Sequence, residues 1–440
     1  MIQPIIQRLD TTSASFLESM DRLLTLPEES HSEIRTQVRD ILSAVRLNGD
    51  AEVLALSNRF DHLDATSLAD LEISQADMAA ALSRIDPLVA EALEESISRV
   101  THYHEQQLAA LGGGGEWQYT DEHGNLLGQI VRGMERVGVY APGGKACYPS
   151  TVIMTVIPAK VAGVEEVILT VPTPFNQISD VLLAAAHLCG VDRMFRVGGA
   201  QAIAALAYGT ESIPRVDKIV GPGNIYVTTA KEMVFGHVGI DMIAGPSEIV
   251  IVADDQAEVD WLVMDMFAQA EHDEMAQSIL VSASASLLDR VAARLPEMLA
   301  DMSRKEIIGP ALADRGALIL VRDEKEAQDV VNRIAPEHLE LALVNAETFV
   351  SGVRHAGAIF VGAHTAEVVG DYTAGPSHVL PTSGTARFAS PLGVYDFQVR
   401  SSLVQCSRAG SVKLSRSAAI LAEQEGLEAH GKSAQYRFQG

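Results

Sequence analysis

The feature that most restricts the fold of this chain is an alternation of short apolar runs with helical stretches between about residues 136 and 362. Runs such as RVGVY (136–140), EEVILTV (165–171) and GAIFVG (357–362) have the length and composition of buried strands. Stretches such as AQAIAALAYG (200–209) lie between them and are typical of helices. Strands that alternate with helices predict a parallel sheet covered by helices. The runs are too many for one small sheet, so we expect two α/β domains.

The regions before and after this alternation have a different pattern. A helical stripe runs from Ile34 to Val45 and stops at Gly49, and Pro87 opens a second helix that continues through His104. The GGGG run (112–115) ends this region, and EWQYTDEHG follows it as a turn-rich stretch. Near the end, residues 411–429 predict one helix with a single apolar side. A segment this short cannot build its own core, so it must dock on another surface.

Composition limits the possible functions. The net charge of −25 argues against a broad nucleic-acid surface, although it allows a small anion site. We find no apolar run long enough to cross a bilayer, and MIQPIIQRLD lacks the pattern of a signal peptide. The three cysteines, Cys147, Cys189 and Cys406, are far apart and show no zinc or redox spacing. We therefore expect a cytoplasmic protein without structural disulfides.

Glycine-rich turns follow several predicted strands, where α/β folds bind ligands. None of them forms a clean G-x-G-x-x-G dinucleotide fingerprint after a strand. The GPGN turn at Gly221 to Asn224 is the best placed, between KIV and a predicted helix. It is equally consistent with a simple tight turn.

Two motifs combine groups that could transfer protons or bind metal. In APEHLEL, Glu337 and His338 are adjacent and follow Pro336, which is typical either of a solvated helix start or of a proton-transfer pair. In FAQAEHDEMAQ, Gln269 and His272 are three residues apart and share one face of a helix. That pair is consistent with a polar helix end or with two metal ligands, although glutamine is an uncommon zinc ligand.

Two further motifs carry charge in turns. GDYTAGPSHVLPT places Asp371 and His378 in a loop that either connects two elements or carries function. EGLEAHGK places Glu425 and His430 five residues apart, so one ideal helix face does not hold both. One amide, two imidazoles and a carboxylate would suit zinc or manganese, but the spacing alone does not bring them together.

The chain as a whole closely resembles the histidinol dehydrogenase family. The resemblance covers roughly residues 27 to 435 and rests on eight separate motifs in order, with no departure at a family ligand or catalytic position. The motifs are VGVYAPGG, VGGAQAIAALAYGTESIP, VDKIVGPGN, AGPSEIVIVAD, AQAEHD, APEHLEL, GDYTAGPSHVLPT and EGLEAH. The resemblance implies NAD-dependent oxidation of L-histidinol through L-histidinal to L-histidine, with one zinc ion per subunit.

The resemblance also implies roles for individual residues. It makes Glu337 the group that activates water and His338 the general base. It assigns zinc to Gln269, His272, Asp371 and His430, which together with His338 also contact the substrate. It adds Ser247, His378 and Glu425 as substrate contacts, and Tyr140, Gln201 and Asn224 as NAD contacts.

The family fold implied is an intertwined homodimer of chains with two Rossmann-like domains that lack the usual fingerprint. On that basis we expect residues 1–26 to form an N-terminal helical segment and 391–440 a C-terminal helical segment that reaches the partner. Residues 27–139 and 249–390 would form the domain with the metal and catalytic residues. Residues 140–248 would form the NAD domain.

Two rival functions use the same residues. A zinc hydrolase would use Glu337 to activate metal-bound water without any nicotinamide. A metal-dependent binding protein would hold imidazoles without turnover. The adjacent Glu337 and His338, and the strand–turn–helix repeats of dinucleotide-binding type, favour the dehydrogenase.

Overall fold

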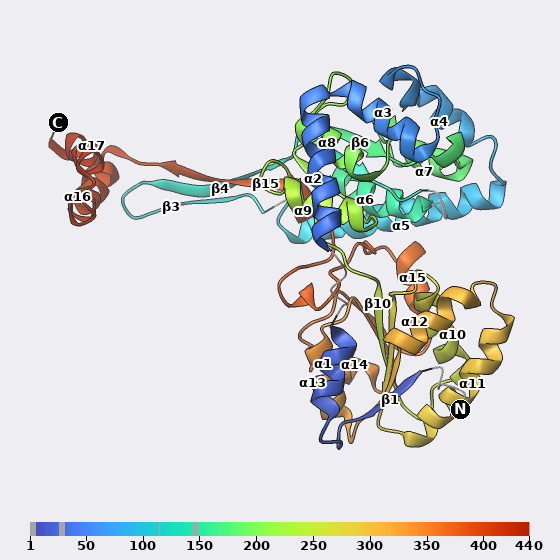
Figure 1. The fold of residues 1–440 in the computed structure, drawn as a ribbon. Coiled ribbons are helices and arrows are strands. Elements are labelled where there is room, and N and C mark those ends of the chain that lie inside the picture. The colour runs from blue at the N-terminus through green and yellow to red at the C-terminus, as the bar shows by residue number, and fades with distance from the viewer. Residues whose placement is uncertain (1–5, 26–30, 114, 144–147, 440) are drawn as a thin grey trace.

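The computed structural model describes residues 6–25, 31–113, 115–143 and 148–439. These residues form two α/β domains, one above the other in Figure 1, and an arm that extends to one side. Each domain contains a six-stranded sheet, and a third sheet of three strands lies in the arm. None of the described helices has both the length and the apolar character needed to cross a membrane.

The first sheet, sheet A, has the order β1-β12-β11-β10-β13-β14, and all its strands are parallel. Its strands are β1 (Gln7–Asp10), β10 (Glu248–Ala253), β11 (Gln277–Ser282), β12 (Ala317–Leu320), β13 (His338–Ala342) and β14 (Ala358–Val361). Its helices are α1 (Phe16–Leu24), α10 (Val259–Ala270), α11 (Ala285–Asp301), α12 (Lys305–Arg315), α13 (Glu324–Ile334), α14 (Ala346–Val350) and α15 (Glu367–Tyr372). Strands β10, β11 and β13 are buried at every position. The apolar runs of β10 and β11 predict this burial, whereas β13 also buries the polar side chains of His338 and Glu340.

The second sheet, sheet B, has the order β2-β7-β6-β5-β8-β9, and β2 alone runs antiparallel to its neighbour. Its strands are β2 (Glu72–Ile73), β5 (Arg136–Tyr140), β6 (Glu166–Thr170), β7 (Arg193–Phe195), β8 (Lys218–Val220) and β9 (Gly239–Ile240). Its helices are α2 (His31–Asn48), α3 (Asp50–Asp61), α4 (Gln75–Ala81), α5 (Pro87–Ala110), α6 (Pro149–Val161), α7 (Asp180–Leu188), α8 (Gly199–Tyr208) and α9 (Ile225–Val234). The two α/β domains, with sheets that are parallel except for β2, confirm the predicted fold class.

The strand pairing divides the chain differently from the predicted borders. Residues 1–26 were expected to stand apart, but β1 pairs with β12 and the side chains of Phe16, Met20 and Leu23 lie in the core of sheet A. Residues 27–139 were assigned to the catalytic domain, but α2 packs on α8 and α9, and α5 packs on α6, beside sheet B. An amphipathic stripe shows that a helix has a buried face, but it does not show which sheet that face covers.

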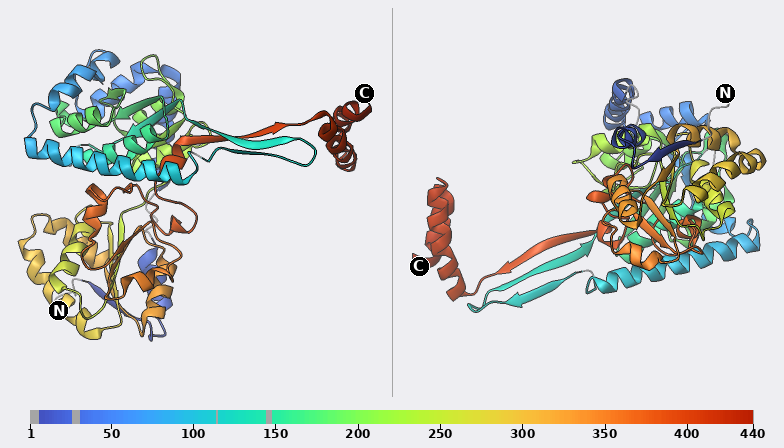
Figure 2. Two further views of the ribbon diagram at one scale, coloured as in Figure 1. Left: turned by 180° about the vertical axis from the view of Figure 1, so that it is seen from behind. Right: turned by 90° about the horizontal axis from the view of Figure 1, so that it is seen from below.

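The arm consists of β3 (Trp117–Thr120), β4 (Leu126–Gly133) and β15 (Gln398–Gln405), joined as an antiparallel sheet with β4 in the centre. At its far end lie α16 (Arg408–Gln424) and α17 (Glu428–Gln439), away from both domains in every view (Figures 1 and 2). The sequence interpretation of 116–124 as a turn-rich stretch missed β3, and the single helix predicted over 411–429 is two helices. Gly426, with φ +70°, lies at the break between them.

Candidate active site

Glu337 and His338 lie at the start of β13, in the middle of sheet A. Helix α13 ends at Ile334, and Ala335 adopts the left-handed conformation that closes it. Pro336 therefore follows a helix, so the alternative that Glu337 begins a solvated helix is wrong. Both side chains are buried, with 6% and 4% of their surfaces exposed. A buried acid beside a buried imidazole costs folding free energy, so this pair is a functional candidate.

The backbone of Glu248, at the start of β10, holds both members of the pair. The Nδ1 of His338 lies 2.9 Å from the carbonyl oxygen of Glu248, which can only accept, so Nδ1 carries the proton. The Nε2 atom has no hydrogen-bond partner among the described residues. Burial lowers the pKa of His338 to about 3. His338 is therefore a neutral imidazole with a fixed tautomer and a free lone pair.

The carboxyl group of Glu337 is held by the same residue. Its Oε2 accepts a hydrogen bond from the backbone N–H of Glu248 at 2.8 Å. Burial raises the pKa of Glu337 well above its usual value, and the carboxylates of Glu248 and Asp371 raise it further. Glu337 is thus a group that can take a proton at neutral pH, unlike an exposed glutamate.

A second group of side chains surrounds this pair. His338, Glu367 and Asp371 offer ligand atoms that all lie within 4.8 Å of one another. An oxygen of Asp371 lies 4.0 Å from Nε2 of His338 and 4.0 Å from Nδ1 of His378. Burial raises the pKa of Asp371 to about 6 and lowers that of His378 to about 4.

These crowded groups fit a divalent cation. The buried Nε2 of His378, like that of His338, has no hydrogen-bond partner among the described residues. Carboxylates that repel one another, beside imidazoles that remain unprotonated, are the donor set that a cation of the zinc or manganese type stabilises. Burial, and then repulsion between the carboxylates, raises the pKa of Glu367 and Glu337, and a cation would offset both.

Most of the residues predicted for metal and substrate come together at the amino edge of sheet A. Gln269 is fully buried in the last turn of α10, and His272 lies exposed just beyond that helix. Ser247 immediately precedes β10, and His378 lies in the loop after α15. The sequence analysis missed Glu367 because it placed Asp371 in a loop, whereas both acids lie on one face of α15, four residues apart.

The residues predicted to contact NAD lie at the carboxyl edge of sheet B. Tyr140 ends β5, and its hydroxyl accepts a hydrogen bond from the N–H of Gly199 at 3.2 Å. Gln201 is buried in the first turn of α8, and its Oε1 has no partner among the described residues. Asn224 caps α9, where its side chain accepts from two backbone N–H groups.

The carboxyl edge of sheet B and the amino edge of sheet A lie next to each other, because a short segment of the chain connects them. It leaves β9 at Ile240 and enters β10 at Glu248, so seven residues connect the carboxyl edge of sheet B to the amino edge of sheet A. Hydrogen bonds also cross between the domains. Ser96 Oγ of α5 donates to the carbonyl of Tyr372 at 2.5 Å, and Ser377 Oγ donates to that of Met154 at 3.0 Å.

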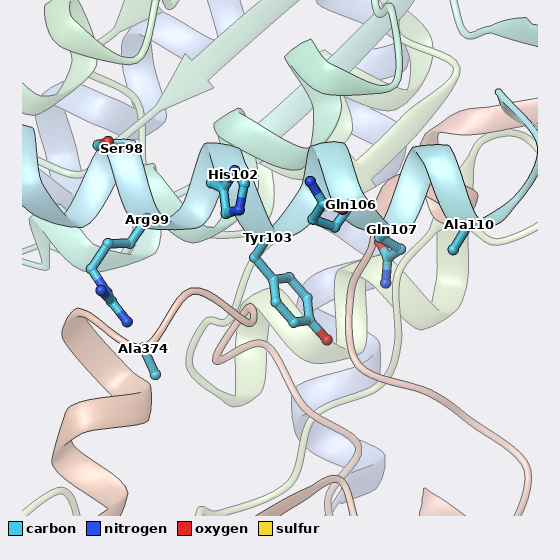
Figure 3. A pocket seen from close by; sticks show the side chains of 8 residues that line it. All are labelled: Ser98, Arg99, His102, Tyr103, Gln106, Gln107, Ala110 and Ala374. Atoms are coloured by element: carbon cyan, nitrogen blue, oxygen red, sulfur yellow. The ribbon is translucent and has the colours of Figure 1, made fainter.

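A cavity of about 620 Å³ lies beside the site but not over it. It follows α5 and reaches the loop after α15 at Ala374, with the side chains of Arg99 and Tyr103 directed toward that loop (Figure 3). Arg99 also donates to the carbonyl of Thr373. Neither Glu337 nor His338 lines the cavity, so it marks the junction of the domains near Asp371 and is not the reaction centre.

The remaining predicted residues are far from this cluster within the chain. Glu425 closes α16 and His430 lies in the first turn of α17, both exposed at the far end of the arm. The cysteines give no reactive thiol at the cluster among the described residues. Burial raises the pKa of Cys189, Cys406 is exposed on the arm, and Cys147 lies outside the described residues.

Fold and site together define a two-domain α/β enzyme in which a dinucleotide-type sheet faces a buried acid–base cluster. A family model described as histidinol dehydrogenase matches residues 24–438. The chain is 55% identical to the histidinol dehydrogenase of Pseudomonas putida, with 99% of this chain and 98% of the relative covered. It is 56% identical to that of Pseudomonas aeruginosa, with 98% and 97% covered.

A solved structure agrees with these sequences. The crystal structure of histidinol dehydrogenase from Elizabethkingia anophelis superposes with a TM-score of 0.92 at 29% identity, covering 100% of this chain and 99% of that one. The chain belongs to the histidinol dehydrogenase family and has the oxidoreductase activity of that family, in histidine biosynthesis.

Proposed function

We propose that the chain, in the cytoplasm, converts L-histidinol through L-histidinal to L-histidine with two NAD and one zinc ion per subunit. Overall, histidinol, one water and two NAD⁺ give histidine, two NADH and three protons. The observation that carries this proposal is the buried pair Glu337 and His338, in which one group is a neutral imidazole with a free Nε2 and the other a carboxyl of raised pKa. Two different proton transfers need two such groups.

In the first half-reaction, His338 is the general base. Its Nε2 takes the proton of the substrate hydroxyl while a hydride leaves the carbon that bears this hydroxyl. The hydrogen bond from Nδ1 to the Glu248 carbonyl supports this role, because it keeps the ring in the required tautomer and stabilises the imidazolium that forms.

In the second half-reaction, Glu337 activates water. Its carboxylate takes a proton from the water that adds to the aldehyde, and the resulting hydrate loses the second hydride. The N–H of Glu248 fixes the carboxyl group for this step. The scheme needs no cysteine thioester.

The metal would be held by Gln269, His272 and Asp371, with His430 as the fourth ligand. When bound, zinc would orient the substrate's imidazole and amino nitrogens, and NAD would accept the hydride in each half-reaction. Ser247, His378 and Glu425 would complete the substrate contacts. We assign His338 to proton transfer and not to the metal because its Nε2 is needed as the base.

We further propose a homodimer in which a second copy of the chain supplies His430 and Glu425. The arm supports this arrangement, because it carries both residues away from the cluster of its own chain (Figure 2). Its tip also exposes large apolar side chains, of which Ile420 and Leu421 are 62% and 64% exposed. A pair of short helices with such a surface needs a partner surface to cover it.

The test is the stoichiometry of NADH with histidinol as substrate, before and after metal removal. We expect two NADH per histidinol, loss of turnover after chelation, and recovery with zinc or manganese. NAD binding should persist without metal, because no proposed ligand is a cofactor contact. Full activity in metal-free protein would exclude the zinc role, and product formation without NADH would favour a hydrolase.

A further inference from the structure

Glu367 is a buried carboxyl group to which the mechanism above gives no role. It opens α15, and 4% of its surface is exposed. When the Gln269 amide is oriented to satisfy its hydrogen bonds, the amide nitrogen lies 2.7 and 3.3 Å from the two carboxyl oxygens of Glu367. One of those oxygens also lies 3.3 Å from Nδ1 of His338. Glu367 therefore contacts one proposed metal ligand and the proposed base.

The hydrogen bond between Glu367 and Gln269 determines which end of the amide faces Glu367. A bound cation favours the ionised form of Glu367, and a carboxylate accepts hydrogen bonds but does not donate them, so the amide turns its nitrogen toward Glu367. The opposite orientation would bring the amide oxygen against the carboxyl oxygens and leave buried acceptors without a donor. With its nitrogen held at Glu367, Gln269 directs its oxygen the other way, and the oxygen is the atom by which an amide binds metal.

The position of Glu367 in the chain strengthens this argument. It precedes Asp371 by four residues, so both lie on one face of α15 and approach the cluster together. Helix α10 packs against α15, which brings Gln269 to the same place. A single short helix thus carries one proposed ligand and the group that orients another.

On the basis of the proposed zinc site, we infer that Glu367 is a positioning residue that turns the Gln269 oxygen toward the metal and is not itself a ligand. Groups that orient metal ligands in this way typically affect metal affinity by about 10- to 100-fold when they are replaced. The inference predicts that Glu367 contributes to zinc affinity through Gln269 and not independently of it.

The test is a double-variant cycle in the full-length protein, with zinc affinity measured by competition with a chromogenic chelator. Glu367→Met removes both acceptors at similar length and should weaken zinc binding about 10- to 100-fold. Glu367→Gln keeps one acceptor and should fall between this variant and the parent. In a Gln269→Ala background, Glu367→Met should weaken binding further by less than about threefold, because the group it orients is gone.

Glu340→Gln is the matched control, because Glu340 is also a buried carboxyl and has no hydrogen bond to Gln269. Glu340 accepts from the backbone N–H of Glu367, and glutamine at position 340 keeps that acceptor. The zinc affinity of this variant should equal that of the parent. If the double variant loses zinc affinity by the product of the two single losses, the inference is overturned. Glu367 would then be an independent ligand or a purely structural group. If the parent itself binds no zinc, the proposed function fails instead. If Glu367→Met does not fold, Glu367→Gln in the two backgrounds gives the same comparison.

Discussion

Sheets A and B have the same strand order, apart from the antiparallel direction of β2, but place their candidate site residues at opposite edges. In sheet A, β10 has β11, β12 and β1 on one side and β13 and β14 on the other, and in sheet B, β5 has β6, β7 and β2 on one side and β8 and β9 on the other. Sheet B places the predicted cofactor residues at its carboxyl edge, where α/β folds bind ligands. Sheet A places Glu337, His338 and the metal candidates at its amino edge.

The difference follows from what each edge offers a ligand. At the carboxyl edge of sheet B, α8 and α9 begin, and helix N-termini attract the phosphates of a dinucleotide. At the amino edge of sheet A, α10 and α15 end, near Gln269 and Asp371. Helix C-termini carry partial negative charge and favour a cation. The short connection from β9 to β10 sets an edge suited to an anion against an edge suited to a cation.

Replacing the proposed base, His338, should cause the largest loss of activity at the amino edge of sheet A. His338→Asn keeps a polar side chain but removes Nε2, so alcohol oxidation should fall by about 10²- to 10⁴-fold. NAD binding, at the other edge, should not change. The rate of NADH formation from histidinol is the measurement. An alcohol step that survives the substitution would rule out His338 as the base.

Glu337→Gln should separate the two half-reactions. Because only the aldehyde step needs activated water, oxidation of histidinal should fall by about 10²-fold or more, and oxidation of histidinol by less. The two substrates are assayed separately under single-turnover conditions. Equal losses on both would show that Glu337 has no step-specific role.

Mixing two inactive variants tests whether the amino-edge site includes the arm of a second chain. His430→Ala and Glu337→Gln are unfolded together and refolded as a mixture. In a mixed dimer, one site combines an intact Glu337 with an intact His430 from the other chain, and the second site carries both defects. With random pairing, about a quarter of all sites should recover.

The control for this experiment is each variant refolded alone, which should stay inactive. Mass analysis of tagged chains must show that mixed dimers formed. If they form and no activity returns, each chain completes its own site.

The pH dependence of histidinol oxidation, the alcohol step, should show how far burial lowers the pKa of His338. For a histidine with the ordinary pKa of about 6.5, the neutral fraction would fall about tenfold between pH 7.5 and 5.5. Burial lowers the pKa of His338 to about 3, so the base stays neutral over that range. We expect less than a twofold fall in the alcohol step at saturating zinc and substrate. A midpoint near pH 6.5 would contradict this.

The sequence predicted most of the buried strands but did not show at which edge of a sheet the candidate residues lie. Continuous apolar runs identify β10 or β11 wherever they pair, because burial on both faces demands them, but β13 contains His338 and Glu340 and was not recognised as a strand. The same runs do not reveal strand order, so the position of His338 at the amino edge became visible only in the structure. Glu367 was missed because an acid in the first turn of a helix is ordinary, and only its contact with Gln269 distinguishes it. The arm was missed because β3 is only four residues long, exposed throughout, and lies in a stretch that also has turn residues.

The smallest effect should come from the carboxyl edge of sheet B, where Asn224→Ala removes the cap of α9. The side chain accepts from the N–H groups of Tyr226 and Val227, so its loss should destabilise the protein by about 1 kcal/mol. The frayed helix start should raise KM for NAD a few-fold, since these N–H groups belong to the proposed anion-binding edge. Zinc affinity should not change, because no metal candidate lies there.

Gln269→Ala is the matched change at the opposite edge, and it should lower zinc affinity while leaving NAD binding intact. Thermal unfolding, NAD titration and chelator competition on both variants give the comparison. Loss of zinc in Asn224→Ala, or loss of NAD binding in Gln269→Ala, would show that the two edges are coupled. Independent losses would establish that each sheet binds its own ligand and that the connection from β9 to β10 only brings the two together.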